Sequence, residues 1–427
     1  MTTLAWFSPL PPIRSGVAAY SAELLARLKD RFVIDVYPEA AAHDFLWRAR
    51  RRPYDLIVYQ LGNAPCHDYM WAYLASHPGL VVLHDARLHH ARARRLLAQR
   101  RVDDYRAEFR YDHPDANAAF AEYAVEGLGG SIYYFWPMLR VVMRTARAVA
   151  VHNTRIAGDL REQYPEAAIE TIRMGVEHPI VEADARTATR RALALPDEAV
   201  VFAAFGKVTA EKRIGPILHA VRALVDEGCD ARLLLVGDAD GYPALDAQIR
   251  QHRLGDRVRV TGHVADDAIG RHLAAADVCL CLRWPTAQET SASWLRCLAA
   301  GRPTVITDLA HLVDVPSRVA VRVDLLDEEA SLLAAMRKLA ADPRARAALA
   351  QAGHAYWSEH HTLDAMAADY ERVIARALSC RRPEAIDLPA HFTDDYSQLA
   401  RSVGRQFRVD VDILRATALP TRSRARW

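Results

Sequence analysis

Short apolar runs alternate with helical patterns along most of this chain. In the second half the runs are VVFAAFG, ARLLLVGD, RVRVTGHV, DVCLCLRW, PTVITD and VAVRVD. They are continuously apolar rather than alternating, which is typical of strands buried on both faces of a parallel sheet. The first half shows a looser version in LAWFSPL, FVIDVY, DLIVYQLG, GLVVLHD, RAVAVHN and IETIRMGV. The pattern predicts an α/β protein with two doubly wound parallel-sheet domains.

Breaks in this pattern indicate how the chain is divided. At 427 residues it is too long for one ordinary core, and the periodicity is lost near the middle. We therefore expect an N-terminal domain over 1–180 and a C-terminal domain over 181–365. Segment 87–147 is predicted to be a mainly helical insertion in the first domain. A helix over 366–381 is expected to pack back toward that domain, and 382–427 to form a tail.

Composition narrows the class of protein. The formal net charge is +2, so a dedicated nucleic-acid binder is not expected. Six cysteines are scattered without any CxxC pair, and Cys279 and Cys281 read as small core residues rather than metal ligands. These features favour a reducing, cytoplasmic setting. The N-terminus lacks the pattern of a signal peptide, and IYYFWPMLRVVM, which Pro137 and Arg140 interrupt, is too short to span a bilayer.

A basic loop follows the first expected strand of the second half. In FAAFGKVTAEKRIG the strand ends at Gly206, Lys207 follows at once, and Lys212 stands where the next helix starts. Ligands of open α/β sheets bind at the carboxyl ends of strands, and helix N-termini attract anions. The loop therefore favours a phosphate site over two solvated lysines. It is not a dinucleotide fingerprint, because neither domain has GxGxxG in its first βα turn.

In the segment PTAQETSASWLRCLAAGRP a polar loop leads into a mostly apolar helix. At helical spacing, Glu289, Ser293 and Arg296 share one face. Thr290 and Ser291 are suited to cap the helix, and the free N–H groups at its start suit an anion. The alternative is a structural pair of Glu and Arg that holds a buried helix.

Together these motifs resemble the retaining GT-B glycosyltransferases of the large family four, also called group 1. The resemblance covers about residues 1–375 and implies two Rossmann-like domains facing each other across a cleft. In that family a strand ends in glycine and a basic residue, with lysine five positions on. Gly206, Lys207 and Lys212 match, and the resemblance implies that both lysines hold the donor diphosphate. LAAGRPTVITD matches the A-x-G-x-P turn that ends the family's signature helix.

The signature itself departs from the family pattern. The family places two glutamates eight residues apart; registered from the A-x-G-x-P turn, they fall on Gln288 and Arg296. This chain carries an ETS…LR variant that resembles a side branch of the family. The resemblance implies that Glu289 holds a sugar hydroxyl at the catalytic centre and that the backbone of Thr290 and Ser291 contacts phosphate. Arg296 cannot accept hydrogen bonds from ribose, so we expect it at the diphosphate or beside Glu289.

Further motifs fit the same family. PPIRSGVAAY resembles its first loop, in which Gly16 lets the backbone approach the donor phosphate. VVLHDARL places His84 after a strand, and the resemblance implies a catalytic role in which it holds a sugar hydroxyl and stabilises the transition state. The alternative is a strand-end histidine with a structural hydrogen bond. The loop at Gly262–Val264 is implied to face the base, which makes Val264 the expected base contact.

The sequence therefore predicts a hexosyltransferase that moves a sugar from a nucleoside-diphosphate sugar to a hydroxyl acceptor. The resemblance implies retention of anomeric configuration. Asp238 and Asp240 read as turn residues, so no metal site and no cofactor beside the donor are expected; the lysines and helix N-termini would stabilise the leaving group. Two alternatives stay open: an accessory subunit that binds nucleotide sugar without catalysis, and a GT-B epimerase acting on the nucleotide sugar.

The acceptor is expected to meet the insertion. RLHHARARRLLAQRR, residues 87–101, alternates basic and apolar residues at helical spacing. We expect this segment, with Arg92, Arg94 and Arg95, to contact anionic lipid at the inner face of a membrane or to hold a lipid-linked acceptor; the alternative is a solvated helix. SIYYFWP is expected either to line a cleft for a glycan acceptor or to pack in the core.

Overall fold

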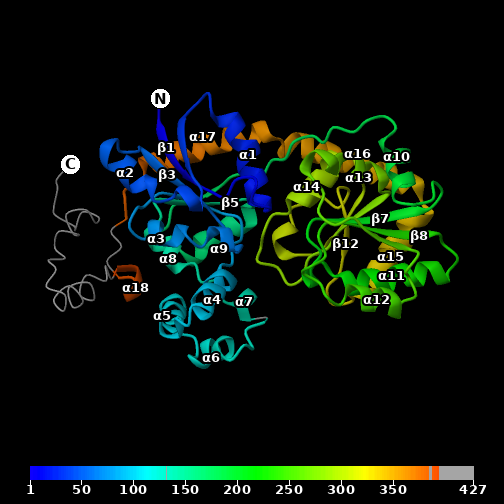
Figure 1. The fold of residues 1–427 in the computed structure, drawn as a ribbon, viewed down its shortest axis with the longest axis horizontal. Coiled ribbons are helices and arrows are strands. Elements are labelled where there is room, and N and C mark those ends of the chain that lie inside the picture. The colour runs from blue at the N-terminus through cyan, green and yellow to red at the C-terminus, as the bar shows by residue number, and fades with distance from the viewer. Residues whose placement is uncertain (131, 384–386, 394–427) are drawn as a thin grey trace.

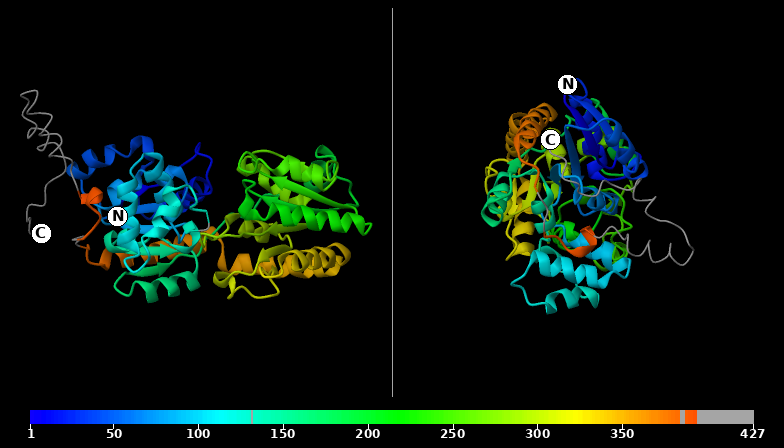
Figure 2. Two further views of the ribbon diagram at one scale, coloured as in Figure 1. Left: turned by 90° about the horizontal axis from the view of Figure 1, so that it is seen from below. Right: turned by 90° about the vertical axis from the view of Figure 1, so that its left-hand side faces the viewer.

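Two parallel β-sheets organise the molecule, with helices packed around each of them (Figure 1). The computed structural model describes residues 1–130, 132–383 and 387–393. Viewed from below, the two sheets and their helices form two lobes that lie end to end (Figure 2). The predicted α/β class with two doubly wound parallel sheets is confirmed.

The N-terminal sheet contains six strands in the order β2-β1-β3-β4-β5-β6. The strands are β1 (Thr3–Phe7), β2 (Val33–Tyr37), β3 (Leu56–Leu61), β4 (Leu80–Leu83), β5 (Ala148–Val151) and β6 (Ile169–Thr171). All neighbouring strands pair in parallel. The chain leaves β1 on one side to form β2 and then crosses to the other side for β3, so the sheet has a topological switch point between β1 and β3.

The C-terminal sheet also contains six strands, in the order β12-β11-β10-β7-β8-β9. The strands are β7 (Val200–Phe205), β8 (Ala231–Val236), β9 (Val258–Val260), β10 (Val278–Cys281), β11 (Thr304–Thr307) and β12 (Val321–Val323). β7 and β10 are neighbours, with Val278 opposite Phe202, although two strands separate them in sequence. The switch point of this sheet therefore lies between β7 and β10.

Apolar cores on both faces explain why the strand sequences are continuously hydrophobic. In β1, Leu4 and Trp6 join one core cluster, whereas Ala5 and Phe7 join another. Successive side chains of a strand point to opposite faces, so a strand buried on both faces needs apolar residues at every position. The first of these clusters continues into the C-terminal lobe through Trp294 and links the two lobes.

The helices of the N-terminal lobe include the predicted insertion. They are α1 (Gly16–Leu28), α2 (Asp44–Arg51), α3 (Met70–Leu74), α4 (His89–Ala98), α5 (Val102–Asp112), α6 (Ala119–Val125), α7 (Ile132–Phe135), α8 (Arg140–Thr145) and α9 (Thr154–Gln163). In Figure 1, α4 to α7 extend below the sheet as a helical lobe. Tyr105 and Phe109 are at the centre of its small core.

Two arginines of 87–101, the segment expected to contact anionic lipid or a lipid-linked acceptor, form ion pairs within the protein. Arg92 is 5% exposed, its Nε lies 2.7 Å from Glu108 Oε2, and its guanidinium lies 4.3 Å from the ring centre of Trp71. Arg94 Nη2 donates to Asp68 Oδ1 at 2.9 Å. Acidic partners on neighbouring elements hold both side chains; that of Arg92 is buried, whereas that of Arg94 is 30% exposed.

The C-terminal lobe is completed by seven helices among the described residues, most of which lie between its strands in sequence. They are α10 (Ala185–Ala192), α11 (Ile214–Asp226), α12 (Leu245–Gln251), α13 (Ile269–Ala275), α14 (Ala292–Ala299), α15 (Glu328–Ala341) and α16 (Pro343–His360). Short 3-10 turns are η1 (Glu39–Ala41), η2 (Pro65–His67), η3 (Ala210–Lys212), η4 (Asp266–Ala268) and η5 (Ala310–Leu312).

The chain then returns to the N-terminal lobe. Helix α17 (Leu363–Ser379) packs against α1, and the hydroxyl groups of Tyr370 and Tyr20 lie 2.7 Å apart. The short helix α18 (Ala390–Thr393) places Phe392 against the N-terminal core, so part of the expected tail is packed. The rest of that tail, 394–427, lies outside the described residues. None of the helices in the described chain is both long and apolar enough to cross a bilayer.

Candidate active site

The loops at the C-terminal switch point line a cavity of about 110 Å³ between the two lobes. Its walls come from the end of β7, the loop over 282–291 that follows β10, and the first turn of α14. His152 and Asn153, which follow β5, close it from the N-terminal lobe. Ligands of doubly wound sheets bind at such a crevice because the two connecting loops diverge there.

Lys212 lines this cavity, as the phosphate prediction requires. Its Nζ donates to the carbonyl oxygen of Phe205, the last residue of β7. Burial of the ammonium group, followed by the positive charge of Arg283, lowers the pKa of Lys212 to about 7. Gly206 has a φ of +85°, and a Cβ there would lie 2.9 Å from Lys212 Nζ. Glycine at this position therefore allows the positive φ of the turn and leaves room for the Lys212 ammonium group.

An ion pair fixes Glu289 at the opposite wall. Arg283 Nε lies 2.7 Å from Glu289 Oε1, and the hydroxyl of Thr286 donates to Oε2 at 2.8 Å. The preceding residue, Gln288, has a φ of +61°, which turns the chain sharply before the glutamate. Glu289 lines the cavity with both oxygens engaged, so its orientation is set before any ligand binds.

Helix α14 begins at the cavity. Ser291 is its N-cap, and the Ser291 hydroxyl accepts from the backbone N–H of Trp294 at 3.2 Å, which confirms one of the two predicted caps. The hydroxyl of Thr290 instead points to the carbonyl oxygen of His152 at 3.5 Å. Ser293 also lines the cavity. The start of the helix therefore presents hydroxyl and N–H groups on the same side as Lys212.

The segment after β4 meets this loop from the N-terminal lobe. The backbone N–H of Ala86 donates to the carbonyl oxygen of Ala287 at 2.9 Å. Asp85 Oδ2 accepts from the backbone N–H of Asn63 at 2.7 Å. Burial and the negative charge of Glu289 raise the pKa of Asp85 to about 7. Asp85 is thus a carboxyl group that is partly protonated near neutral pH and lies close to Glu289.

His84 lies at the other side of the same strand end. Its Nε2 is 2.8 Å from Gln60 Oε1, and Gln60 Nε2 donates to the Tyr370 hydroxyl at 3.0 Å. The ring packs edge-on against Tyr20, with ring centres 4.7 Å apart. Burial, with the nearby His152, holds the pKa of His84 well below its usual value, so the imidazole is neutral. The hydrogen bond to Gln60 agrees with the alternative interpretation, a strand-end histidine with a structural hydrogen bond. His84 does not line the cavity.

Arg296, expected at the diphosphate or beside Glu289, pairs with acidic residues outside the cavity. Its Nη2 lies 2.7 Å from Glu23 Oε1 of α1, and its Nη1 lies 3.7 Å from Asp266. Burial raises the pKa of Glu23, whereas the positive charge of Arg296 lowers it. The arginine therefore joins the two lobes instead of lining the cavity, because helix α14 turns this face toward α1.

Three further predicted residues lie outside the cavity. Lys207 is exposed and its Cε lies 2.9 Å from where a Cβ on Gly241 would be, so the side chain runs along the loop after β8. A Cβ on Gly16 would meet no atom, so the chain itself does not require glycine there. Val264 packs against the core cluster beside β7. Their roles toward a donor stay predictions.

Sequence reasoning missed Arg283, Asp85 and His152. Arg283 and Asp85 each follow a strand end closely, which was a usable signal, but neither belongs to a recognised motif. His152 follows β5 in the same way; its Nδ1 is 3.0 Å from the carbonyl oxygen of Ile172, whereas its buried Nε2 has no hydrogen-bond partner within the described residues. Burial lowers the pKa of His152 to about 4.

Two of the cysteines and the acidic turn lie in structural surroundings. In the described part of the chain no three His, Cys, Asp or Glu side chains are arranged to hold a metal ion. Asp238 Oδ1 accepts from the backbone N–H of Asp240 at 2.9 Å, which is turn chemistry. Cys279 is buried in β10, and the sulfur atoms of Cys281 and Cys297 lie 4.0 Å apart as free thiols.

Comparison with known proteins places this site in context. Residues 199–342 match a family model described as Glycosyl transferases group 1. A 2-deoxystreptamine glucosyltransferase from Streptomyces kanamyceticus is 27% identical over 194 residues, which is 44% of this chain and 49% of that protein. A GDP-mannose-dependent alpha-(1-6)-phosphatidylinositol dimannoside mannosyltransferase from Mycobacterium tuberculosis is 29% identical over 178 residues, 40% and 45% of the two chains. The chain thus spans about half the length of the relatives it matches.

Solved structures match over more of the chain. Sucrose-phosphate synthase from Thermosynechococcus elongatus has a TM-score of 0.64 at 16% identity and covers 88% of this chain and 99% of its own. HepE from Anabaena, solved with UDP-glucose, has a TM-score of 0.63 at 14% identity and covers 88% and 100%. At this level of identity the likeness shows the fold, and it confirms the GT-B arrangement expected from the sequence.

Proposed function

We propose that this chain is a nucleotide-sugar-dependent glycosyltransferase of the group 1 type. The observation that carries the proposal is the position of Lys212 and Arg283 at the C-terminal switch point. They lie together beside the start of α14 and within a cavity that the N-terminal lobe closes. The match of 199–342 to the group 1 family model supports the same conclusion from sequence.

The cationic groups would stabilise the leaving nucleoside diphosphate. Negative charge builds on the diphosphate as the bond to the sugar breaks, and preorganised donors lower the energy of that state. Lys212 Nζ, the guanidinium of Arg283 and the free N–H groups at the start of α14 are the donors in place. Because these groups supply the positive charge, we expect transfer to proceed without added divalent metal.

The sugar would lie between Glu289 and the segment after β4. Glu289 is oriented by Arg283 and Thr286 to accept from sugar hydroxyls. Asp85, with a pKa of about 7, is able to donate or accept at neutral pH. His84 is neutral and supports this segment from behind through Gln60. We expect retention of configuration, and closure of the two lobes would exclude water from the reacting bond.

The acceptor would approach from the helical insertion. The Tyr134 hydroxyl donates to Glu211 Oε1 at 3.4 Å, which brings α7 against the donor loop. Burial and the charges of Glu211 and Glu289 raise the pKa of Tyr134 to about 12. Phe135 next to it is 69% exposed, as suits an aromatic residue that faces a sugar ring. We propose a hydroxyl acceptor here, on a glycan or a lipid-linked compound.

The test is donor turnover by the purified chain. UDP-glucose and GDP-mannose are the first donors to try, since relatives or structural neighbours are named with them. Release of UDP or GDP is measured with EDTA and with Mg²⁺, together with binding of each diphosphate by calorimetry. Lys212→Ala should abolish turnover, whereas Lys338→Ala, at an exposed site on α15, should not.

Three outcomes would contradict the proposal. Diphosphate binding that Lys212→Ala leaves unchanged would remove the assigned site. An isomerised nucleotide sugar formed without acceptor would identify an epimerase. Tight diphosphate binding without hydrolysis or transfer, in the presence of crude glycan and lipid acceptors, would identify an accessory subunit.

A further inference from the structure

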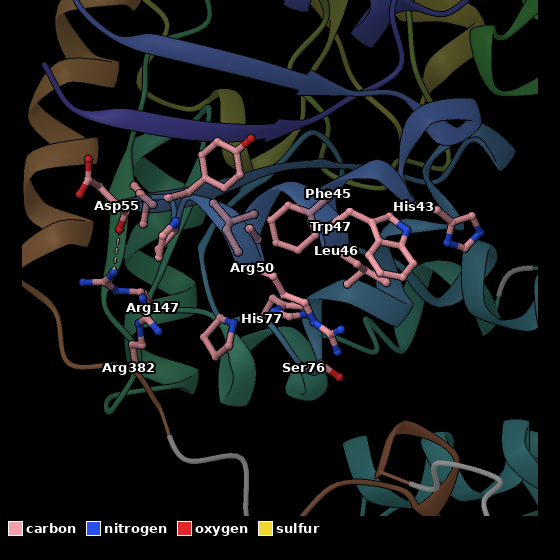
Figure 3. Close-up of a pocket in the computed structure, with 16 residues that line it drawn as sticks. His43, Phe45, Leu46, Trp47, Arg50, Asp55, Ser76, His77, Arg147 and Arg382 are labelled. Atoms are coloured by element: carbon pink, nitrogen blue, oxygen red, sulfur yellow. Dashed lines mark hydrogen bonds between the residues drawn. The ribbon is translucent and has the colours of Figure 1, made fainter. Parts of the chain in front are cut away.

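A second and larger cavity, of about 620 Å³, lies on the N-terminal lobe (Figure 3). It is bounded by α2 and by the residues that precede β3, β4 and β5, among them Tyr54, Pro78 and Arg147. These are the amino ends of the strands, so the cavity opens at the sheet edge opposite the candidate active site. Its volume is that of a typical small-molecule site.

One end of this groove is apolar and aromatic. Phe45, Leu46 and Trp47 of α2 extend over it (Figure 3), and Tyr54 and Ile57 add to its wall. Trp47 is 58% exposed, although α2 packs on the sheet through the buried Phe45. An exposed tryptophan beside an apolar groove is a feature of ligand and partner sites rather than of ordinary surface.

Two arginines lie at the other end, where Asp55 also lines the groove with its carboxylate accepting from Thr3. Arg147 and Arg382 lie together there (Figure 3), and in the described part of the chain neither forms an ion pair. Arg147 is held by the backbone carbonyl oxygens of Leu378 and Cys380, at 2.8 and 3.0 Å. Burial and then the charge of Arg382 lower the pKa of Arg147. Arg147 is half-buried, and a charge removed from water in this way normally has an acidic partner, whereas Arg382 is exposed.

Two buried polar atoms beside this pair also lack hydrogen-bond partners among the described residues. They are Nε of Arg147 and Nε2 of His77, and both residues line the groove. The His77 ring packs against Phe45, with ring centres 5.1 Å apart, so it lies where the apolar wall meets the basic end. Buried polar groups without partners are rare in native proteins and point to a missing acceptor.

We propose that this groove binds a single-chain lipid phosphate. The hydrocarbon chain lies along Phe45, Leu46 and Trp47, and the phosphate accepts hydrogen bonds from Arg147 and Arg382. A phosphate monoester carries nearly two negative charges at neutral pH, which balances the two arginines. Arg382 is suited to bind phosphate through two parallel hydrogen bonds, whereas Arg147 would contribute its charge and its Nε, the atom without a partner among the described residues. This site is separate from the donor cavity and does not depend on the proposed transferase activity.

Calorimetry of the full chain with decyl phosphate, below its micelle concentration, tests the proposal. We expect saturable binding of one molecule, with 1-decanol and inorganic phosphate each binding about tenfold or more weakly because each lacks one half of the recognition. Arg382→Ala should weaken decyl phosphate binding about tenfold. The matched control is Arg52→Ala, an exposed arginine at the end of α2 that does not line the groove.

Tryptophan fluorescence locates the bound chain. Decyl phosphate should shift the emission of Trp47 to shorter wavelength, and Trp47→Phe should remove that shift while binding persists. Three results would overturn the proposal: no saturable binding, equal affinity for 1-decanol, or equal affinity of Arg382→Ala. Binding to vesicles that contain phosphatidylglycerol without any binding of monomeric decyl phosphate would also overturn it, since the face would then contact a membrane surface. Diphosphate binding at the donor site should stay unchanged in both groove variants.

Discussion

Two basic segments of this protein, η3 and α4, have opposite roles in the structure. Lys212 in η3 has a carbonyl oxygen as its hydrogen-bond partner and a second cation, Arg283, nearby. Arg92 in α4 is buried against Glu108, which is 2% exposed and also accepts from His391. Among the described residues Lys212 has no acidic partner, so it is a candidate for binding an anionic ligand, whereas Arg92 has Glu108 as its acidic partner and serves the structure.

The largest effect should come from removing the partner of Arg92. Glu108→Ala leaves a buried guanidinium without its carboxylate, so we expect the free energy of unfolding to fall by about 3–5 kcal/mol. Urea unfolding followed by circular dichroism measures it. Glu122→Ala is the matched control, because Glu122 pairs with Arg106 at the surface of the same insertion and should have little effect. A small loss for Glu108→Ala would show that the pair is not structural.

The opposite behaviour is expected at Lys212. Lys212→Met should weaken binding of the nucleoside diphosphate by about 2 kcal/mol, roughly thirtyfold, since a charge-assisted hydrogen bond to phosphate is lost. The thermal midpoint should hold or rise at pH 7, because the variant removes a buried cation that has no acidic partner. Calorimetry measures the change in diphosphate affinity, and thermal unfolding measures the change in the thermal midpoint. A drop in both quantities would mean that Lys212, like Arg92, serves the structure.

The pH dependence of binding sharpens the same contrast. In the free protein the pKa of Lys212 is about 7, below its usual value of 10.5. A bound diphosphate stabilises the charged form and raises this pKa, so binding takes up a proton between about pH 7 and 9. Affinity should therefore fall as pH rises through this range, by at most about tenfold per pH unit. Calorimetry in buffers of different ionisation enthalpy measures the proton uptake, and Lys212→Met should lose it.

The smallest effect on the donor is expected from the pair between the lobes. Glu23→Gln breaks the contact with Arg296 but leaves Lys212, Arg283 and Glu289 in place. We expect diphosphate affinity to change by less than about threefold, while stability falls by about 1 kcal/mol. Arg296→Ala should behave like Glu23→Gln in calorimetry and in urea unfolding. A tenfold loss of affinity in Arg296→Ala alone would support the predicted diphosphate role.

Local features of the site followed from sequence. Ser291 caps α14 and Lys212 lies at the cavity, because capping and strand-end position depend on neighbours within a few residues. The family resemblance predicted a site role for Glu289, and Glu289 lines the cavity. Gln288, which stands at the family's glutamate position, does not line it. Hydrogen-bond chemistry placed Arg296 at the diphosphate or beside Glu289, and this stays a prediction; in the structure α14 directs that side chain toward Glu23 of the other lobe.

The sequence by itself determined the class of fold and the positions of most strands. A strand buried on both faces must be apolar at every position, so each strand can be recognised from its own few residues. The tertiary structure decided which polar residues are free to bind. Arg296 pairs with Glu23, which is 273 residues away in the sequence. Asp85 of the N-terminal lobe lies close to Glu289 of the C-terminal lobe. Charge and burial depend on neighbours distant in sequence, so no local pattern records them.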